Sequence, residues 1–153
     1  MSALIIRDAT LDDLQFIAAL CDADEVAAAR DPLRNDHAEQ MRDGFMAITS
    51  DPNHRLLIAE RNGGRVGSFQ LSFIPGVSRR GAWRGQIESV RVAAESRSQG
   101  IGEEMMRWAI AQCEARGCCI IQLTSDRQRE AAHRFYKRLG FEASHSGFKL
   151  KLG

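Results

Sequence analysis

The sequence predicts an α/β (α+β) domain of three layers, with a mixed, mostly antiparallel sheet of about six to seven strands flanked by about four helices. Short apolar segments of strand length alternate with longer segments whose apolar residues recur at helical spacing. Two of the strand-length segments lie on either side of Asn62-Gly63-Gly64, residues that tolerate positive φ. This turn predicts a hairpin in the middle of the chain, and the interleaved helices predict that the sheet is covered.

The first half of the chain predicts three strands and two helices. Thr10 and Asp13 have the spacing of a capping box, so a helix is expected from Thr10 to Cys21. A second helix is expected from Asn35 to Ile48, and Asp51-Pro52-Asn53 ends it. The expected strands of this half cover residues 3–7, 55–60 and 65–74.

The second half begins with a polar, glycine-rich loop over residues 75–85. A helix begins near Gly100 and ends at Gly117, and another ends at Gly140, because glycine is the usual residue after a helix. These helices cover residues 100–116 and 127–139. The expected strands cover residues 86–92 and 118–124, with one or two closing strands from Phe141 to Leu152, where Phe148, Leu150 and Leu152 alternate.

Composition limits the partners of this chain. Its 153 residues suit one domain, expected to cover residues 1–153, and its 44% hydrophobic content is typical of globular proteins. A formal net charge of +1 predicts neither a nucleic-acid partner nor a membrane partner. No apolar run suits a membrane helix, and the N-terminal segment does not resemble a signal peptide, so we expect a cytoplasmic protein.

The cysteines and histidines do not predict a metal site. The four cysteines form no C-x-x-C pair, and the four histidines form no H-x-H or H-x-x-x-H pair. We therefore expect reduced, mostly structural cysteines and no metal cofactor.

The segment from Glu88 to Glu103 carries the clearest chemical signal. It combines the end of a strand, a loop with two glycines and the start of an amphipathic helix. The glycines allow a ligand to approach the backbone closely, and the N–H groups at a helix start favour an anion. Arg97 adds a charged side chain, so the segment suits a pyrophosphate.

Three phosphate-binding patterns can be compared with this segment. A P-loop needs G-K-[ST], which occurs nowhere in the chain. A dinucleotide fingerprint would need a third glycine at Met105. The pattern Arg/Gln-x-x-Gly-x-Gly/Ala, in contrast, matches Arg97 to Gly102 in full.

With this motif the sequence resembles the GNAT superfamily of N-acetyltransferases. A strand lies directly upstream, and the segment from Ala132 to Phe141 matches a second signature of that superfamily, A-x-x-F-Y-x-x-x-G-F. The resemblance covers about residues 85–152. The tail from Ser144 to Leu150 and the run from Ala132 to Tyr136 are similar to aminoalkylphosphonate N-acetyltransferases.

The resemblance implies an acetyl-CoA-dependent transfer of an acetyl group to the primary amine of a small molecule, by direct attack in a ternary complex. Glu88 would act as the base and Tyr136 as the acid that protonates the leaving thiolate. Many relatives have asparagine at the position of Asp126, so this contact departs from the pattern. The coenzyme-binding residues that it implies are Val90, Arg91, Val92, Arg97, Ser98, Gln99, Gly100, Ile101, Gly102 and Asp126.

Each of these residues also has a structural interpretation. Tyr136 could pack beside Phe135, Glu88 could face solvent on its strand, and Asp126 could cap the following helix. The main alternatives for the whole chain are a protein, peptide or polyamine acetyltransferase and a non-catalytic CoA-binding module. A homodimer is compatible with a domain of this type.

Two groups of charges bear on the acceptor. An arginine-rich loop would suit an anionic small amine; it contains Arg79, Arg80 and Arg84. An acidic groove would favour polycations, although its residues could equally be a solvated helix end; they are Asp22, Asp24, Glu25 and Asp31.

Overall fold

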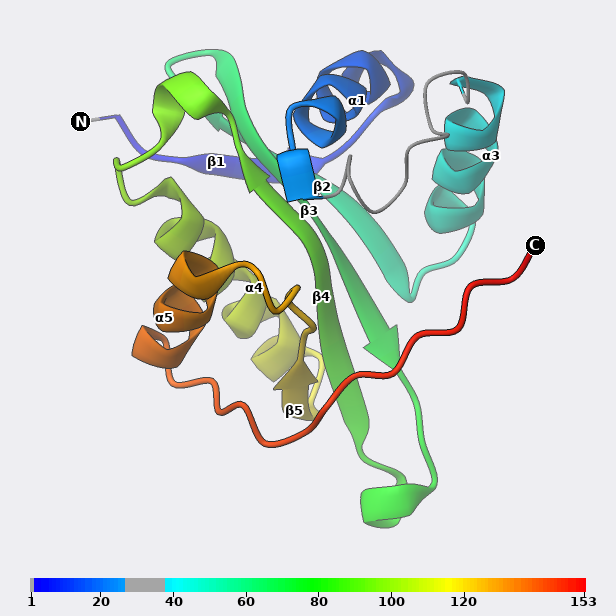
Figure 1. Ribbon diagram of the computed structural model, residues 1–153. Coiled ribbons are helices and arrows are strands. Elements are labelled where there is room, and N and C mark those ends of the chain that lie inside the picture. Colours follow the sequence, from blue (N-terminus) through cyan, green and yellow to red (C-terminus); the bar gives the residue numbers. More distant parts are fainter. Residues whose placement is uncertain (1, 27–37) are drawn as a thin grey trace. The chain divides into compact units, whose positions relative to one another are not determined.

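The computed structural model describes residues 2–26 and 38–153 (Figure 1). The chain divides into two compact units, Met1–Leu123 and Thr124–Gly153. The first unit contains a five-stranded sheet, with β1 (Ile5–Asp8), β2 (His54–Arg61), β3 (Gly64–Ile74), β4 (Trp83–Val92) and β5 (Cys118–Gln122). Its helices are α1 (Leu14–Asp22), α3 (Ala38–Thr49) and α4 (Ile101–Ala115), with 3-10 turns at Leu11–Asp13, Ser78–Gly81 and Ala94–Ser96.

The strands lie in the order β1-β2-β3-β4-β5. The first four are antiparallel, as the central hairpin predicts, and β5 pairs with β4 in parallel. The predicted fold class, a mixed and mostly antiparallel sheet with flanking helices, is therefore confirmed, with five strands in the described residues instead of six or seven.

Helix α4 lies unusually close to one face of the sheet. A side chain at Gly67 would place its Cβ 2.8 Å from the Met105 sulfur, and one at Gly85 would place it 2.3 Å from the Cys113 sulfur. Both glycines therefore let β3 and β4 approach the helix, whose side chains Met105 and Cys113 are buried. Phe69 packs edge-on against Trp108 on the same face, with ring centroids 6.0 Å apart.

The opposite face is covered by α1 and α3 (Figure 1). Phe45 of α3 and Ile58 of β2 are buried together there, and Leu14 and Ile17 of α1 pack against them. The helix expected from Asn35 corresponds to α3, although Asn35 itself lies outside the described residues.

A buried carboxylate ties the first helical turn to the sheet. Asp13 is fully buried and accepts two hydrogen bonds from the Arg7 guanidinium, at 2.7 and 2.9 Å, and one from Arg65 at 2.7 Å. It also accepts the Thr10 backbone N–H at 2.7 Å, which confirms the predicted capping box. The hydrogen bonds from Arg7 hold the pKa of Asp13 well below its usual range.

The second unit consists of α5 (Glu130–Arg138) and the segment that follows it. Gly140, with φ 100°, ends the helix as expected, and its N–H donates to the Lys137 carbonyl at 3.0 Å. None of the helices in residues 2–26 and 38–153 is long and apolar enough to cross a membrane.

The two largest differences between the expected strands and the structure concern residues 141–152 and the start of β4. No strand is present from Phe141 to Leu152 in the described chain, and Phe148, Leu150 and Leu152 are largely exposed. Alternation of apolar residues indicates which side chains would share a face, but a strand also needs a hydrogen-bonded neighbour. Strand β4 begins at Trp83 rather than Gln86, because Arg84 and Gly85 pair with β5 and shorten the preceding loop.

We expect the substitution Asp13→Asn to lower the free energy of unfolding by about 3 kcal/mol, because it removes the negative charge of a buried carboxylate that forms ion pairs with two arginines. Arg7 and Arg65 are partly exposed and can rehydrate, which places the effect at the lower end for a broken buried pair. Urea unfolding at neutral pH measures it, with the exposed neighbour variant Asp12→Asn as the control.

The same contacts predict a pH dependence. Because the pKa of Asp13 is lowered in the folded state, the unfolded chain takes up this proton first as the pH falls. The stabilisation is therefore present above about pH 4 and is lost below it. Unfolding midpoints of Asp13→Asn that fall as steeply below that pH as those of the unmodified protein would contradict this account.

Candidate functional site

Strand β4 has a bulge at Ser89. The register pairs Gln70↔Glu88 and Ser68↔Arg91 place one residue of β3 opposite two residues of β4. Ser89 has φ 56°, a conformation that residues with side chains rarely adopt. A bulge redirects the side chains that follow it, and both Ser89 and Arg91 face the cavity described below.

Strands β4 and β5 pair only along the first part of β4, before this bulge. Strand β5 pairs with β4 from Trp83 to Gln86, and in the described part of the chain no register pair joins it to residues 87–92. Figure 1 shows β4 continuing past the end of β5. This edge of β4, which includes Val90, Arg91 and Val92, can therefore offer backbone hydrogen bonds to an extended ligand.

The loop after β4 leads directly into α4. Two of its residues have positive φ, Ser98 with 62° and Gly100 with 77°, and α4 begins at the next residue, Ile101. The first N–H groups of this helix, including those of Ile101 and Gly102, have no acceptor within the helix and lie at the positive end of its dipole. Together with the exposed side chains of Arg97, Ser98 and Gln99, they form a site suited to a phosphate group.

Two acidic side chains in the first turn of α4 have arginine partners. Glu103 accepts a hydrogen bond from Arg107 at 2.8 Å, and Glu104 forms an ion pair with Arg61. These contacts offset the negative charge that the two carboxylates would otherwise place beside a bound anion.

Glu88 belongs to a chain of side-chain hydrogen bonds. The Gln86 amide donates to the Glu88 carboxylate, and the Gln122 amide donates to the Gln86 oxygen at 2.8 Å. The oxygen of the Gln86 amide accepts the hydrogen bond from Gln122, so the NH2 group of Gln86 is directed at Glu88. Glu88 is exposed, whereas Ile87 beside it is buried on the opposite face of the sheet.

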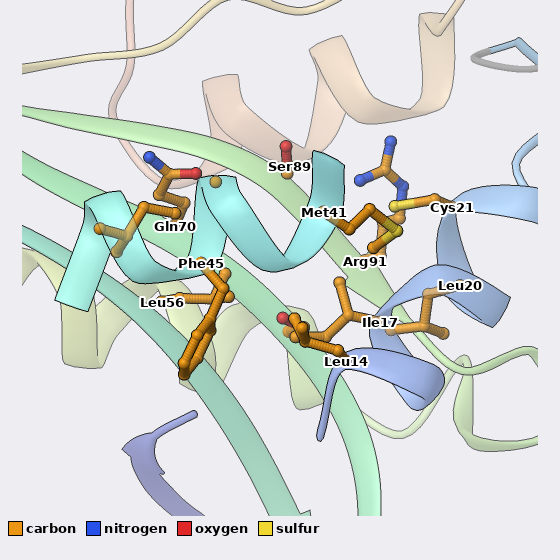
Figure 2. Close-up of a pocket in the computed structure, with 13 residues that line it drawn as sticks. Leu14, Ile17, Leu20, Cys21, Met41, Phe45, Leu56, Gln70, Ser89 and Arg91 are labelled. Atoms are coloured by element: carbon orange, nitrogen blue, oxygen red, sulfur yellow. The ribbon is translucent and has the colours of Figure 1, made fainter. Parts of the chain in front are cut away.

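A cavity of about 190 Å³ lies next to this position, between α1, α3 and the sheet (Figure 2). Its wall on the sheet includes Gln70, Ser89 and Arg91. Gln70 and Glu88 are register partners on neighbouring strands, so Glu88 is next to a residue that lines the cavity.

Tyr136 lies in α5 between two other aromatic rings. Its ring centroid is 5.2 Å from that of Phe135 and 6.0 Å from that of Phe141, both in edge-on arrangements. Burial raises the pKa of the Tyr136 phenol, and the nearby Arg129 lowers it in part. The phenol is therefore protonated at neutral pH and can donate a proton.

Asp126 and His133 have local structural contacts in the same unit. The Asp126 carboxylate accepts the Gln128 N–H at 3.0 Å, and its backbone oxygen lies 2.9 Å from the His133 ring nitrogen Nε2. The carboxylate thus supports the turn before α5, but it does not cap that helix as expected, because the N-cap residue is Arg129 and no side chain caps it. Its expected contact with a coenzyme stays a prediction.

The remaining charged and nucleophilic groups contribute little to this site. Burial raises the pKa of the Cys113 thiol to about 12, so it is not a nucleophile at neutral pH. Arg79 and Arg80 lie in the exposed turn before β4, both with φ 59°. Asp24 pairs with Arg91, and Asp31 lies outside the described residues. Residues 2–26 and 38–153 contain no group of three or more His, Cys, Asp or Glu side chains that could hold a metal ion.

Three of these features are not indicated by the sequence. Serine has no special preference for positive φ, so nothing in the sequence indicates the bulge at Ser89. Gln86 lies on the same predicted strand as Glu88, and Gln122 lies on another predicted strand. The two glutamines meet only because β4 and β5 pair in parallel. The cavity depends on the packing of α1 and α3, which a single sequence does not reveal.

The fold and the loop define an acetyltransferase of the GNAT type, and residues 17–141 match the model of the Acetyltransferase (GNAT) family. The chain belongs to this family. The N-acetyltransferase class expected from the two signatures is therefore confirmed.

The chain is also similar to individual proteins and solved structures over most of its length. The chain is 33% identical over 149 residues to an aminoalkylphosphonate N-acetyltransferase of Salmonella typhimurium, covering 96% of this chain and 90% of the relative. It is similar to a structure described as a transcriptional regulator from Bacillus halodurans C-125, with 37% identity, a TM-score of 0.91 and coverage of 98% and 100%. A predicted acetyltransferase from Clostridium acetobutylicum, solved with acetyl-CoA, has the same fold at 18% identity, a TM-score of 0.75 and coverage of 97% and 96%.

The backbone conformation of Gly100 predicts that a side chain at this position destabilises the folded protein. Replacing it with alanine should lower the free energy of unfolding by about 1–2 kcal/mol, because φ is 77° and a Cβ disfavours that region. No atom lies within 4 Å of the added Cβ, so the effect would come from the backbone alone. Thermal unfolding of Gly100→Ala and of the control Gly44→Ala, in helix α3, measures it.

The control should move in the opposite direction. Gly44 lies inside a helix, so alanine there should stabilise the protein by about 0.5–1 kcal/mol. Equal melting temperatures for the two variants would contradict the left-handed conformation of Gly100.

Proposed function

We propose that this protein transfers the acetyl group of acetyl-CoA to the primary amine of a small molecule by direct attack within a ternary complex. The observation that carries the proposal is the open edge of β4 beside the loop from Arg97 to Gly102 and the start of α4. An open strand edge that is followed along the chain by a helix N-terminus suits a ligand with an extended arm and a pyrophosphate. The family match supports this choice of coenzyme.

In this proposal the backbone of Val90 to Val92 binds the pantetheine arm, and the N–H groups of Gln99 to Gly102 bind the pyrophosphate. Arg97 and Ser98 provide further contacts to the phosphates. Acetyl-CoA supplies an acyl group activated as a thioester. The N–H of Val90 is a suitable donor to the thioester oxygen as negative charge develops there.

Glu88 is the proposed base. An alkylamine has a pKa of roughly 10 and must lose a proton before its nitrogen can attack the carbonyl carbon. The Glu88 carboxylate, directly or through a water molecule, accepts that proton. Gln86, oriented by Gln122, holds the carboxylate in one position.

Tyr136 is the proposed acid. When the new C–N bond forms and the C–S bond breaks, the leaving sulfur carries the negative charge and needs a proton. The half-buried phenol of Tyr136 is protonated at neutral pH and is chemically suited to donate it. No covalent bond to the protein is required.

The proposal covers the whole chain as a single domain. The family match, residues 17–141, includes both signature segments and extends over the two compact units. A small-molecule acceptor is supported by the aminoalkylphosphonate relative. A cytoplasmic location and the absence of nucleic-acid and membrane partners are parts of the proposal, as is homodimer formation.

The experiment that tests this function measures release of free CoA thiol from acetyl-CoA with a panel of primary amines. Tyr136→Phe should lower kcat by about 10²-fold or more, with little change in acetyl-CoA affinity, because a general acid contributes mainly in the transition state. Glu88→Gln should displace the pH profile of kcat/KM upward, because the amine must then lose its proton to the solvent.

The alternatives predict different results. A non-catalytic CoA-binding module would bind the coenzyme tightly and release no thiol with any amine. An unchanged rate in Tyr136→Phe would remove this residue as the acid, and an unshifted pH profile in Glu88→Gln would leave Glu88 a structural residue. Thiol release only with peptides or polyamines would replace the small-molecule acceptor.

A further inference from the structure

The cavity between α1, α3 and the sheet has mainly apolar walls (Figure 2). Helix α3 contributes Met41, Gly44, Phe45 and Ile48, which share one helix face at spacings of three and four residues. Figure 2 shows Leu14, Ile17 and Leu20 of α1 on another side of the same space, near Phe45 and Met41. Its volume of about 190 Å³ exceeds the roughly 150 Å³ apolar cavity that is known to admit benzene.

Arg91, the one cationic side chain among the described residues that line the cavity, is paired. The Arg91 guanidinium donates to the Asp24 carboxylate at 3.1 Å, and the two side chains are only 18% and 10% exposed. A buried anionic ligand would have to compete with Asp24 for this cation and would also lose its hydration among apolar side chains. The cavity is therefore suited to an uncharged apolar group.

The cavity lies beside the residue at which the reacting amine is proposed to bind, Glu88. Its sheet wall includes Ser89 and Gln70, which are the chain neighbour and the register partner of Glu88. A ligand with a polar amine at Glu88 and an apolar body would extend from the edge of β4 into this space.

We propose that the acceptor is a primary amine carrying an apolar group of about the size of a phenyl ring, and that this group occupies the cavity between α1 and α3. The inference rests on the proposed acetyl transfer, because that reaction places the amine at Glu88. The proposal adds a substrate class that is defined by an apolar body rather than by an anionic one.

Gly44 provides a selective way to test the cavity. It is exposed and lines the cavity, so it lies at the opening, and no atom lies within 4 Å of a Cβ built on it. Gly44→Leu can therefore extend an apolar side chain into the space without a backbone clash. Gly44→Ala changes the helix propensity but fills little volume, and Ala47→Leu adds a leucine at an exposed position of the same helix that does not line the cavity.

The experiment measures binding of ethylamine and phenethylamine to the protein saturated with free CoA, by calorimetry, and then acetyl transfer to both amines. Burial of the phenyl ring should make phenethylamine bind about tenfold to a hundredfold more tightly than ethylamine. Gly44→Leu should abolish this preference and leave ethylamine unaffected, while Gly44→Ala and Ala47→Leu retain it. A second pair with an anionic head, aminomethylphosphonate and 1-amino-2-phenylethylphosphonate, should show the same preference for the phenyl group.

Other outcomes separate the two proposals. Equal affinity for the two members of each pair, or a preference that survives Gly44→Leu, would overturn the apolar acceptor even if acetyl transfer occurs. If phenethylamine binds in the cavity but no amine releases thiol, the apolar binding site stands and the acetyl transfer fails. A higher melting temperature of Gly44→Leu without any change in amine binding would identify the space as part of the core alone.

Discussion

The separation of β4 from β5 is the constraint on which the site depends. The two strands pair from Trp83 to Gln86, and the rest of β4, which includes the bulge at Ser89, continues beside β3 without β5. This arrangement has consequences on both sides of the strand. The open edge meets the loop before α4, where Gly100 permits a left-handed turn, and the sheet face beside Glu88 borders the apolar cavity. A coenzyme and an acceptor can therefore approach one short stretch of backbone from two directions.

Charge is distributed unevenly around this stretch. The carboxylates nearest the start of α4 are paired with Arg61 and Arg107, which leaves the helix N–H groups available to an anion. On the other side, Arg91 is paired with Asp24, so the cavity between α1 and α3 is largely neutral. The same strand thus separates a region that favours phosphate from a region that favours apolar groups.

The sequence was sufficient to predict those parts of the structure that depend on local chemistry. The spacing of Thr10 and Asp13 predicted a helix start, and Gly100 predicted the start of α4. The contacts of Asp13 with Arg7 and Arg65, and the alignment of Gln122 with Gln86, require strand register, which one sequence does not contain. The alternation of Phe148, Leu150 and Leu152 predicted a strand, but local pattern alone does not supply a pairing partner.

The most direct test of the central claim is amide hydrogen exchange of the protein with and without free CoA. The account predicts slower exchange at the open edge of β4, residues 90–92, and at the start of α4, residues 99–102, because bound ligand would occupy those N–H groups. Protection confined to other segments, or no change at saturating CoA, would contradict the assignment of this edge and loop as the coenzyme site.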